Sequence, residues 1–421
     1  MKWRNQLLAL LCLLAFAGLG VLYFKHWVVQ RSFGIILMIG EGLGPERIAL
    51  TRAYLGGADN RLAVDTMVHS ALVKNYSKDF AVADQAAAAT AIATGVKVNN
   101  RAISIDSNGK PIPTIVELAR DSGRAVGLIS DKNLTNPTCA AFYAHSNNSD
   151  ADQMALQFAE GGKIDIGLGA SATEFLPPTK QGHRQDHRDL LLEMRGNGFD
   201  VVRTRAELEA IPPWQRPKLF GAFGEKDSAR DSNQNWNDDA SLSDMVRKAI
   251  ELLQYNQSGY LLIVDAARMR EAAEANNAEK ALTETAEFDR AVATAHRYAG
   301  GRSTIIVCGD VAIGGLHANG YPFRKDSGIA LIGLNPAGQP WLTWATGPKG
   351  MQSYGASKLS ENEPSPSASP QKDQAQPAAF YATSALPTLE DVVVFGSGRG
   401  SEVLQGTIDN TDIFKILRDE L

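Results

Sequence analysis

The chain has 421 residues, of which 44% are hydrophobic and 21% are charged, and its 42 basic and 47 acidic side chains give a net charge of −5. This composition excludes a disordered chain and an electrostatic nucleic-acid binder, because apolar residues are plentiful and no basic excess is present. Three cysteines cannot form a disulfide framework, whereas seven histidines with many carboxylates would suffice for a metal enzyme.

An uncharged run of 18 residues, 7–24, lies near the N-terminus. As a helix it would span about 27 Å, close to the hydrocarbon thickness of a bilayer. The short basic start before this run favours a single-pass signal anchor in residues 1–30, with the C-terminal domain on the extracytoplasmic side of the cell membrane. The alternative is cleavage by signal peptidase after Ala17. Both alternatives export the domain formed by residues 31–421.

Beyond residue 31, short apolar runs alternate with longer helical patterns. Continuous apolar runs indicate strands that are buried on both faces, and they cover residues 34–40, 125–130, 260–265, 303–310, 328–334 and 391–395. Helical patterns cover residues 115–121, 242–254 and 266–298. This alternation predicts an α/β fold with a large, mostly parallel β-sheet sandwiched by helices. Residues 355–379 are rich in Ser, Pro and Gln and predict a flexible surface insertion.

Residues that follow the predicted strands are the first candidates for a site, because ligands of such sheets bind at the carboxyl ends of the strands. Glu41 lies in a glycine-rich turn, residues 38–45, directly after the first predicted strand. A helix rich in small residues is predicted from Gln85 onward, with Asp84 as its N-cap. The N-terminus of this helix would offer free N–H groups to an anion.

Together and in order, these two stretches resemble the alkaline phosphatase family, and the resemblance runs from Gly34 to the C-terminus. Further matching stretches are residues 126–129, 140–145, 182–190, 288–292, 314–316 and 390–392. The resemblance implies a phosphatase mechanism in which a serine at a helix N-terminus attacks phosphate. It also implies two zinc ions, a supporting magnesium ion and an arginine that clamps the phosphate.

Several positions that the resemblance assigns to this chemistry hold residues that cannot perform it. Gln85 replaces the nucleophilic serine, and Ser149 replaces the phosphate-clamping arginine. The zinc-ligand positions make zinc an improbable cofactor, because an arginine, a proline and a valine offer no ligand atom for it. These positions are Arg270, Glu274 and Pro387 in the first site, and Val311 beside the retained Asp310 and Glu41 in the second.

The magnesium position keeps oxygen-bearing side chains. The resemblance assigns it to Glu41, Asn136, Thr138 and Asp265, although Asn136 stands where the family has an acidic or histidine ligand. One Mg²⁺ or Ca²⁺ ion could bind there, with Asp310 nearby, and the alternative is a set of hydrogen-bonding residues around a wet cavity. Arg270 suggests a second hypothesis, in which its guanidinium takes the place of the first zinc ion. The alternative for Arg270 is an exposed ion pair with Glu274, one helical turn away.

The sequence thus predicts a membrane-anchored, exported protein with the alkaline phosphatase fold that is a catalytically inactive pseudophosphatase. Its expected role is binding, either of a ligand or of a protein partner, as a homodimer or as a heterodimer with an active relative, and not of nucleic acid. The alternative is a phosphomonoesterase or phosphodiesterase with residual or altered metal-dependent activity.

Overall fold

The structure is a computed structural model that describes residues 2–23, 32–214, 218–223, 240–320, 325, 331–335, 338–350 and 376–421. The chain divides into two compact units, Met1–Ser32 and Phe33–Leu421. The first unit contains helix α1, Lys2–Tyr23. Its segment Trp3–Val21 has the length and hydropathy of a membrane span, and a signal sequence has the same properties.

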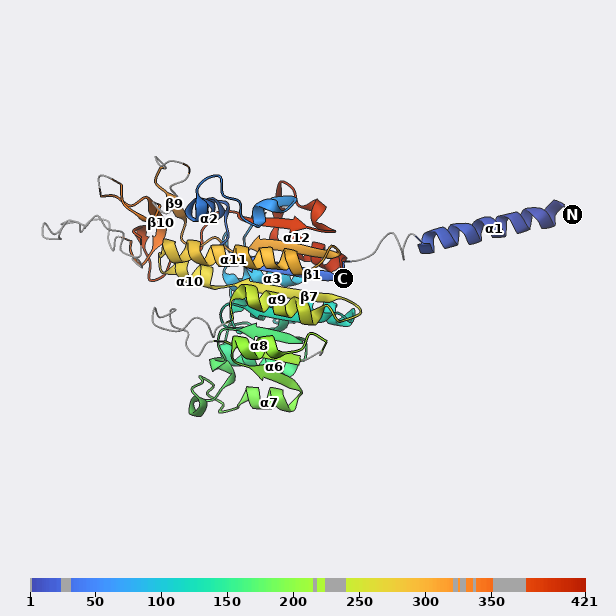
Figure 1. The fold of residues 1–421 in the computed structure, drawn as a ribbon, viewed down its shortest axis with the longest axis horizontal. Helices are drawn as coiled ribbons and strands as arrows, with labels where there is room; N and C mark the ends of the chain where they lie inside the picture. The colour runs from blue at the N-terminus through green and yellow to red at the C-terminus, as the bar shows by residue number, and fades with distance from the viewer. Residues whose placement is uncertain are drawn as a thin grey trace. The chain divides into compact units, whose positions relative to one another are not determined.

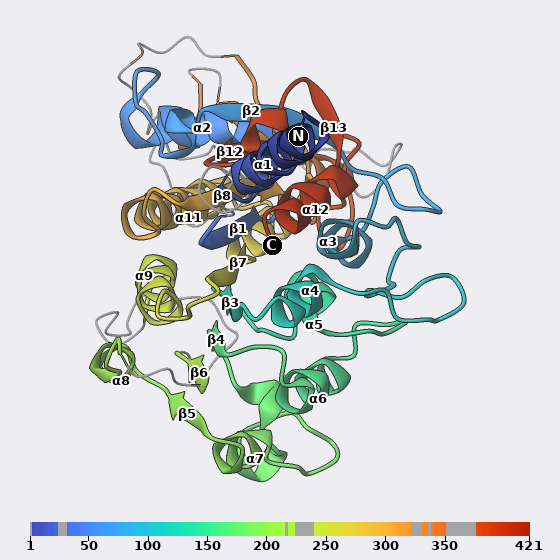
Figure 2. The same cartoon turned by 90° about the vertical axis from the view of Figure 1, so that its right-hand side faces the viewer.

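The second unit is built around a ten-stranded sheet, of which Figure 1 labels β1 and β7. Its strand order, β13-β2-β12-β8-β1-β7-β3-β4-β6-β5, can be followed in Figure 2. Only β12 runs antiparallel to its neighbours β2 and β8 within the described sheet, so the predicted mostly parallel sheet is confirmed. The strands are β1 Gly34–Gly40, β2 His69–Lys74, β3 Ala125–Ser130, β4 Ile166–Gly169, β5 Phe199–Val202, β6 Lys218–Ala222, β7 Tyr260–Ala266, β8 Ser303–Gly309, β12 Val392–Ser397 and β13 Thr407–Asp409.

Strand β1 lies near the middle of the sheet, and all seven of its residues are buried. It pairs in parallel with β7 on one side and β8 on the other. A strand that is covered on both faces cannot alternate apolar and polar residues, which explains its continuous apolar sequence. The carboxyl ends of β7, β1 and β8 therefore meet at one edge of the sheet.

Helices cover both faces of the sheet, as predicted (Figure 2). One apolar cluster joins the sheet to one group of helices: α3 Gln85–Thr94, α4 Ile115–Asp121, α5 Pro137–Tyr143, α6 Ala151–Gly161, α7 Leu190–Gly196 and α12 Asn410–Asp419. A second cluster joins it to another group: α2 Pro45–Gly56, α8 Arg205–Ala210, α9 Leu242–Leu253, α10 Arg268–Glu274 and α11 Ala278–Tyr298. Short 3₁₀ helices occur at Val64–Thr66, Thr173–Phe175, Pro178–Lys180 and Ser401–Val403.

Two sequence-based element assignments are corrected. The helix expected over residues 266–298 is two helices, α10 and α11, because Asn276 adopts a left-handed conformation with φ 55° between them. The buried Asn276 side chain donates to the carbonyl of Thr346, which holds this break in place. The strand expected over residues 328–334 lies partly outside the described residues, and its described part, residues 331–334, forms a turn and one isolated bridge.

A second, three-stranded sheet was not expected from the sequence. It has the order β11-β10-β9, with β9 Leu316–Ala318, β10 Leu342–Gly347 and β11 Ala378–Tyr381. Of the predicted insertion, residues 355–379, the part up to residue 375 lies outside the described residues. Its last two residues, 378 and 379, belong to β11.

Candidate functional site

Three acidic side chains meet where the central strands end. The register aligns Gly40 of β1 with Ala266 of β7 and with Gly309 of β8. Glu41 follows β1, Asp310 follows β8, and Asp265 is the next-to-last residue of β7. All three, called here the strand-end carboxylates, are almost completely buried, with 1%, 2% and 0% of their surface exposed. The structure therefore places the three carboxylates at one edge of the sheet, with Glu41 close enough to the other two to raise the pKa of each.

Glu41 is held by two donors from the helices beside it. Thr138, in the first turn of α5, donates its hydroxyl to Glu41 Oε1 at 2.8 Å. Gln85, the first residue of α3, uses one amide nitrogen to reach Glu41 Oε1 at 2.5 Å and Thr138 Oγ1 at 2.9 Å. Gln85 occupies this place because Asp84 caps α3 by accepting from the amide of Ala87. The helix start predicted at Asp84 is confirmed.

Arg270, on α10, contacts both Gln85 and Glu41. It lies in the first turn of α10 and donates a hydrogen bond to Gln85 Oε1, and its guanidinium is 4.0 Å from Glu41 Oε2. Its Nε donates to Glu274 at 2.7 Å. Burial lowers the pKa of Arg270, but the nearby carboxylates of Glu41, Glu274 and Asp310 outweigh this effect and raise it above its ordinary value. Arg270 therefore combines both proposed roles, the pair with Glu274 and the contact with the site.

Asp265 sits deeper than Glu41 and has different partners. Its Oδ2 accepts hydrogen bonds from Ser130 at 3.0 Å and from the amide of Asn136 at 2.7 Å. Within the described part of the chain, Oδ1 accepts none. Burial, together with repulsion from Glu41, raises the pKa of Asp265 well above its ordinary value. A protonated Asp265 leaves fewer buried charges to be neutralised.

Asp310 is supported by the turn after β1. The backbone N–H of Gly42 donates to Asp310 Oδ1 at 2.9 Å, and Gly42 has a φ of 80°, which favours glycine. Burial and the Glu41 carboxylate raise the pKa of Asp310 to about 7. Arg47, in the first turn of α2, lies against Gly42, and a Cβ at Gly42 would be 2.9 Å from its guanidinium. Glycine is thus required here for conformation and for space.

The sequence analysis did not find Arg47. Only 5% of this residue is exposed, and Nη1 donates to the backbone carbonyls of Glu41 at 3.3 Å and Met269 at 3.2 Å. Burial lowers the pKa of Arg47 to about 10 against the raising effect of Asp310 and Glu390, so it stays charged at neutral pH. No local signal marks Arg47, because Glu46 precedes it in the first turn of α2 and compensates its charge against the helix dipole.

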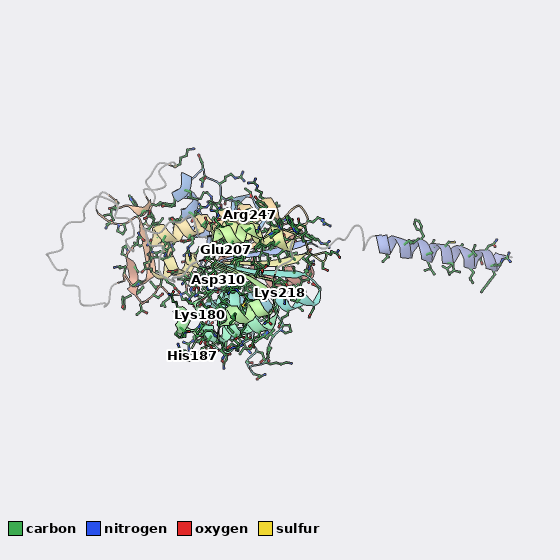
Figure 3. All side chains as sticks on the ribbon, turned by 60° about the horizontal axis from the view of Figure 1, so that its bottom comes forward. Lys180, His187, Glu207, Lys218, Arg247 and Asp310 are labelled. Atoms are coloured by element: carbon green, nitrogen blue, oxygen red, sulfur yellow. The ribbon has the colours of Figure 1, made fainter. Side chains whose placement is uncertain are left out.

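Other residues singled out from the sequence lie apart from this network or serve as scaffold. Ser149 is exposed, directly before the N-cap of α6. Val311 is buried in the apolar cluster between the helices and the small sheet. Pro387 forms an isolated bridge with Ile313. His145, the last residue of the matching stretch 140–145, hydrogen-bonds with the carbonyl of Ser104 and with Glu117. Asp310 is labelled in Figure 3 among the side chains of the main sheet.

Comparison with known proteins identifies the family. The sequence profile described as alkaline phosphatase matches residues 34–421. This chain belongs to the alkaline phosphatase family. Alkaline phosphatase 4 of Bacillus subtilis is 29% identical over 436 residues, which cover 91% of this chain and 88% of that protein. The tissue-nonspecific alkaline phosphatase of Gallus gallus is also 29% identical, over 91% of this chain and 83% of its own length.

Solved alkaline phosphatases share the fold. The Thermus thermophilus enzyme superposes with a TM-score of 0.73 at 22% identity, covering 93% of this chain and 92% of that one. The enzyme from the Antarctic bacterium TAB5 gives a TM-score of 0.69 at 21% identity, covering 93% and 98%. A variant of the TAB5 enzyme was solved with magnesium bound.

The alkaline phosphatase family usually depends on zinc and magnesium, and the side chains of this chain do not fit these ions. Among the described residues, no three His, Cys, Asp or Glu side chains are grouped to hold a metal ion. Asn136 cannot offer its oxygen, because Oδ1 caps α5 by accepting from the amide of Cys139 and only the amide nitrogen faces Asp265. Oε1 of Glu41 and the hydroxyl oxygen of Thr138 already accept an N–H group from Gln85. Gln85 thus places a donor group where a cation would need the lone pairs of these two oxygens, and Asp265 Oδ1 is a buried oxygen that accepts no hydrogen bond among the described residues.

Proposed function

We propose that this member of the alkaline phosphatase family is catalytically inactive and acts by binding a protein partner. The observation that carries the proposal is the side chain of Gln85. It begins helix α3 where the family resemblance places the serine, and its amide is hydrogen-bonded to Glu41, Thr138 and Arg270. An amide has no ionisable hydroxyl, so it cannot form a covalent phosphoryl intermediate.

The charge distribution around Gln85 supports the same proposal. Phosphoryl transfer needs cations that are free to stabilise a developing negative charge. Here the Arg270 guanidinium is already engaged by Glu274, Gln85 and Glu41, and Ser149 replaces the clamping arginine on an exposed loop. An internal network of this kind leaves little for a phosphate ester to bind. The role expected for such a chain is binding, either of a ligand or of a protein partner such as a second copy or an active relative.

The N-terminal helix supports location at a membrane. Segment Trp3–Val21 is long enough to cross a membrane and has a mean hydropathy of 1.6. We infer that it remains attached as a signal anchor with the C-terminal domain outside the cytoplasm. Extraction of membranes with carbonate tests this: an anchored chain stays in the pellet at full length, whereas cleavage after Ala17 releases a shorter, soluble protein.

A turnover assay tests the loss of catalysis. The full-length chain in detergent is incubated with p-nitrophenyl phosphate and with a phosphodiester, each with Zn²⁺, Mg²⁺ or Mn²⁺, beside Bacillus subtilis alkaline phosphatase 4. We expect no saturable turnover in any condition. Saturable turnover that is abolished by Asp265→Ala would overturn the proposal and support residual metal-dependent hydrolysis. The Gln85→Ser variant is also expected to be inactive, because a hydroxyl alone restores neither the cations nor the clamp.

A further inference from the structure

The strand-end carboxylates pose an electrostatic problem that the fold must solve. Glu41, Asp265 and Asp310 are buried together, and charged groups in a protein interior are costly unless they are neutralised. Two arginines lie against them, Arg47 from α2 and Arg270 from α10. Both are in the first turn of a helix, each directly beside an acidic residue of the same turn, Glu46 in α2 and Glu271 in α10.

The two arginines reach the carboxylates from different sides and connect the surrounding elements. Arg47 donates to the carbonyls of Glu41 and Met269, which ties α2 to the end of β1 and to α10. Arg270 donates to Gln85 and Glu274 and lies 4.0 Å from Glu41. The arginines therefore flank the turn of Glu41 and Gly42, and both of their charges are fixed by hydrogen bonds.

We propose that Arg47 and Arg270 are built-in counter-cations of the strand-end carboxylates, so that the folded chain needs no metal ion at this site. A guanidinium cannot dissociate or be removed by a chelator, in contrast to a bound ion. The stability of this chain is then independent of divalent cations, unlike that of a protein whose buried carboxylates share a metal ion. Removal of one guanidinium leaves the carboxylates undercompensated and creates a demand for a soluble cation.

The experiment compares thermal unfolding of the full-length chain in EDTA, in Mg²⁺ and in Zn²⁺, together with metal analysis of the purified protein. For the wild-type chain we expect the same unfolding midpoint in all three conditions and no stoichiometric metal. For Arg270→Met in EDTA we expect a midpoint about 5 °C lower, since a buried charge loses its partner. Divalent cations should recover at least half of this loss.

Arg247→Met is the matched control. Arg247 lies on α9, forms ion pairs with Glu209 and Glu251, and has 21% of its side chain exposed, compared with 25% for Arg270. Its loss should lower the midpoint without making it sensitive to metal. Should Arg270→Met fail to fold, the pair Arg270→Gln and Arg270→Lys answers the same question. Only the neutral glutamine variant is expected to become metal-sensitive.

Two results would overturn this inference. The first is a wild-type midpoint that falls in EDTA and returns with metal, or a purified chain that carries one metal ion per molecule. The second is an Arg270 variant that is as stable as the wild-type chain and indifferent to metal. Both results are independent of turnover. A chain that is inactive but binds a metal ion would refute the proposal about the two arginines and would leave the proposed function unaffected.

Discussion

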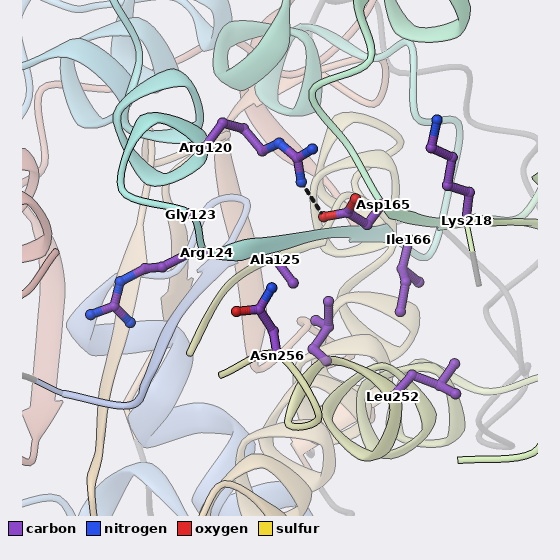
Figure 4. A pocket seen from close by; sticks show the side chains of 10 residues that line it. Arg120, Gly123, Arg124, Ala125, Asp165, Ile166, Lys218, Leu252 and Asn256 are labelled. Atoms are coloured by element: carbon purple, nitrogen blue, oxygen red, sulfur yellow. Dashed lines mark hydrogen bonds and ion pairs between the residues drawn. The ribbon is translucent and has the colours of Figure 1, made fainter. Parts of the chain in front are cut away.

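The two edges of the main sheet carry similar side chains in opposite environments. At the carboxyl ends of β1, β7 and β8, Glu41, Asp265 and Asp310 are buried beside Arg47 and Arg270. At the amino ends of β3, β4 and β6, a cavity of about 340 Å³ is open to solvent. Its charged or polar lining residues are Arg120, Arg124, Asp165, Lys218 and Asn256 (Figure 4).

The ion pair in this cavity illustrates the difference. Arg120 contacts Asp165 at 2.5 Å, but 36% and 22% of their side chains are exposed. Water can therefore solvate either group when its partner is removed, and such pairs contribute little to stability. At the carboxyl ends, no more than 2% of each of the three carboxylate residues is exposed, so only other protein groups can compensate their charge. The comparison teaches that burial, more than the number of ion pairs, decides which charges this fold depends on.

The largest effect is expected for Arg47→Met. This substitution removes the charge that faces Asp310 and leaves the carbonyls of Glu41 and Met269 without this donor. The expected loss is about 3–5 kcal/mol in the free energy of unfolding, measured by urea denaturation. Arg52→Met is the control on the same helix, because Arg52 pairs with Asp65 near the surface. Its loss should be about 1 kcal/mol or less. Equal losses for the two variants would contradict the role given to burial.

An intermediate effect is expected for Glu117→Gln on α4, and it should depend on pH. Burial alone would raise the pKa of Glu117, but hydrogen bonds from His145, Lys163 and the amide of Thr114 lower it to about 2. Because the pKa is lower in the folded state than its ordinary value of 4.5, the stabilisation is complete above about pH 4.5. It is lost as the pH falls toward 2.

Urea denaturation between pH 7 and pH 3 measures this dependence. The difference between Glu117→Gln and the wild-type chain should be about 1 kcal/mol at pH 7 and should shrink below pH 4.5. Glu402→Gln, at an exposed position in a 3₁₀ helix, is the control. A difference for Glu117→Gln that grows toward pH 3 would show that the hydrogen bonds do not favour the charged carboxylate.

Much of the fold and part of the site could be predicted because local patterns encode them. The run of residues 34–40 coincides with β1, and its burial on both faces explains the absence of polar residues. The rule that sites form at the carboxyl ends of parallel strands pointed to Glu41, and the family resemblance added Asp265 and Asp310. The identity of the residues at Gln85 and Arg270 indicated that their chemistry differs from that of the family.

The remaining features depend on contacts between distant segments. Arg47 is two residues into an ordinary helix, and only the folded chain shows that its guanidinium reaches Met269, 222 residues away. The break between α10 and α11 is held by Asn276 and Thr346, 70 residues apart. The orientation of the Asn136 amide could not be predicted from the sequence either. Its oxygen caps α5, and only its nitrogen faces Asp265.

The smallest effect is expected at the open end of the sheet, for Arg120→Ala. Asp165 keeps a hydrogen bond from the amide of Val126 at 2.8 Å, and water can replace the guanidinium. The expected loss is below about 1 kcal/mol at low salt and should nearly vanish in 1 M NaCl, where exposed charges are screened. Arg47→Met, measured in the same two salt conditions, should keep almost all of its loss, because buried charges are screened much less. A loss for Arg120→Ala that matches that of Arg47→Met and is insensitive to salt would mean that the two ends of the sheet do not differ as their burial indicates.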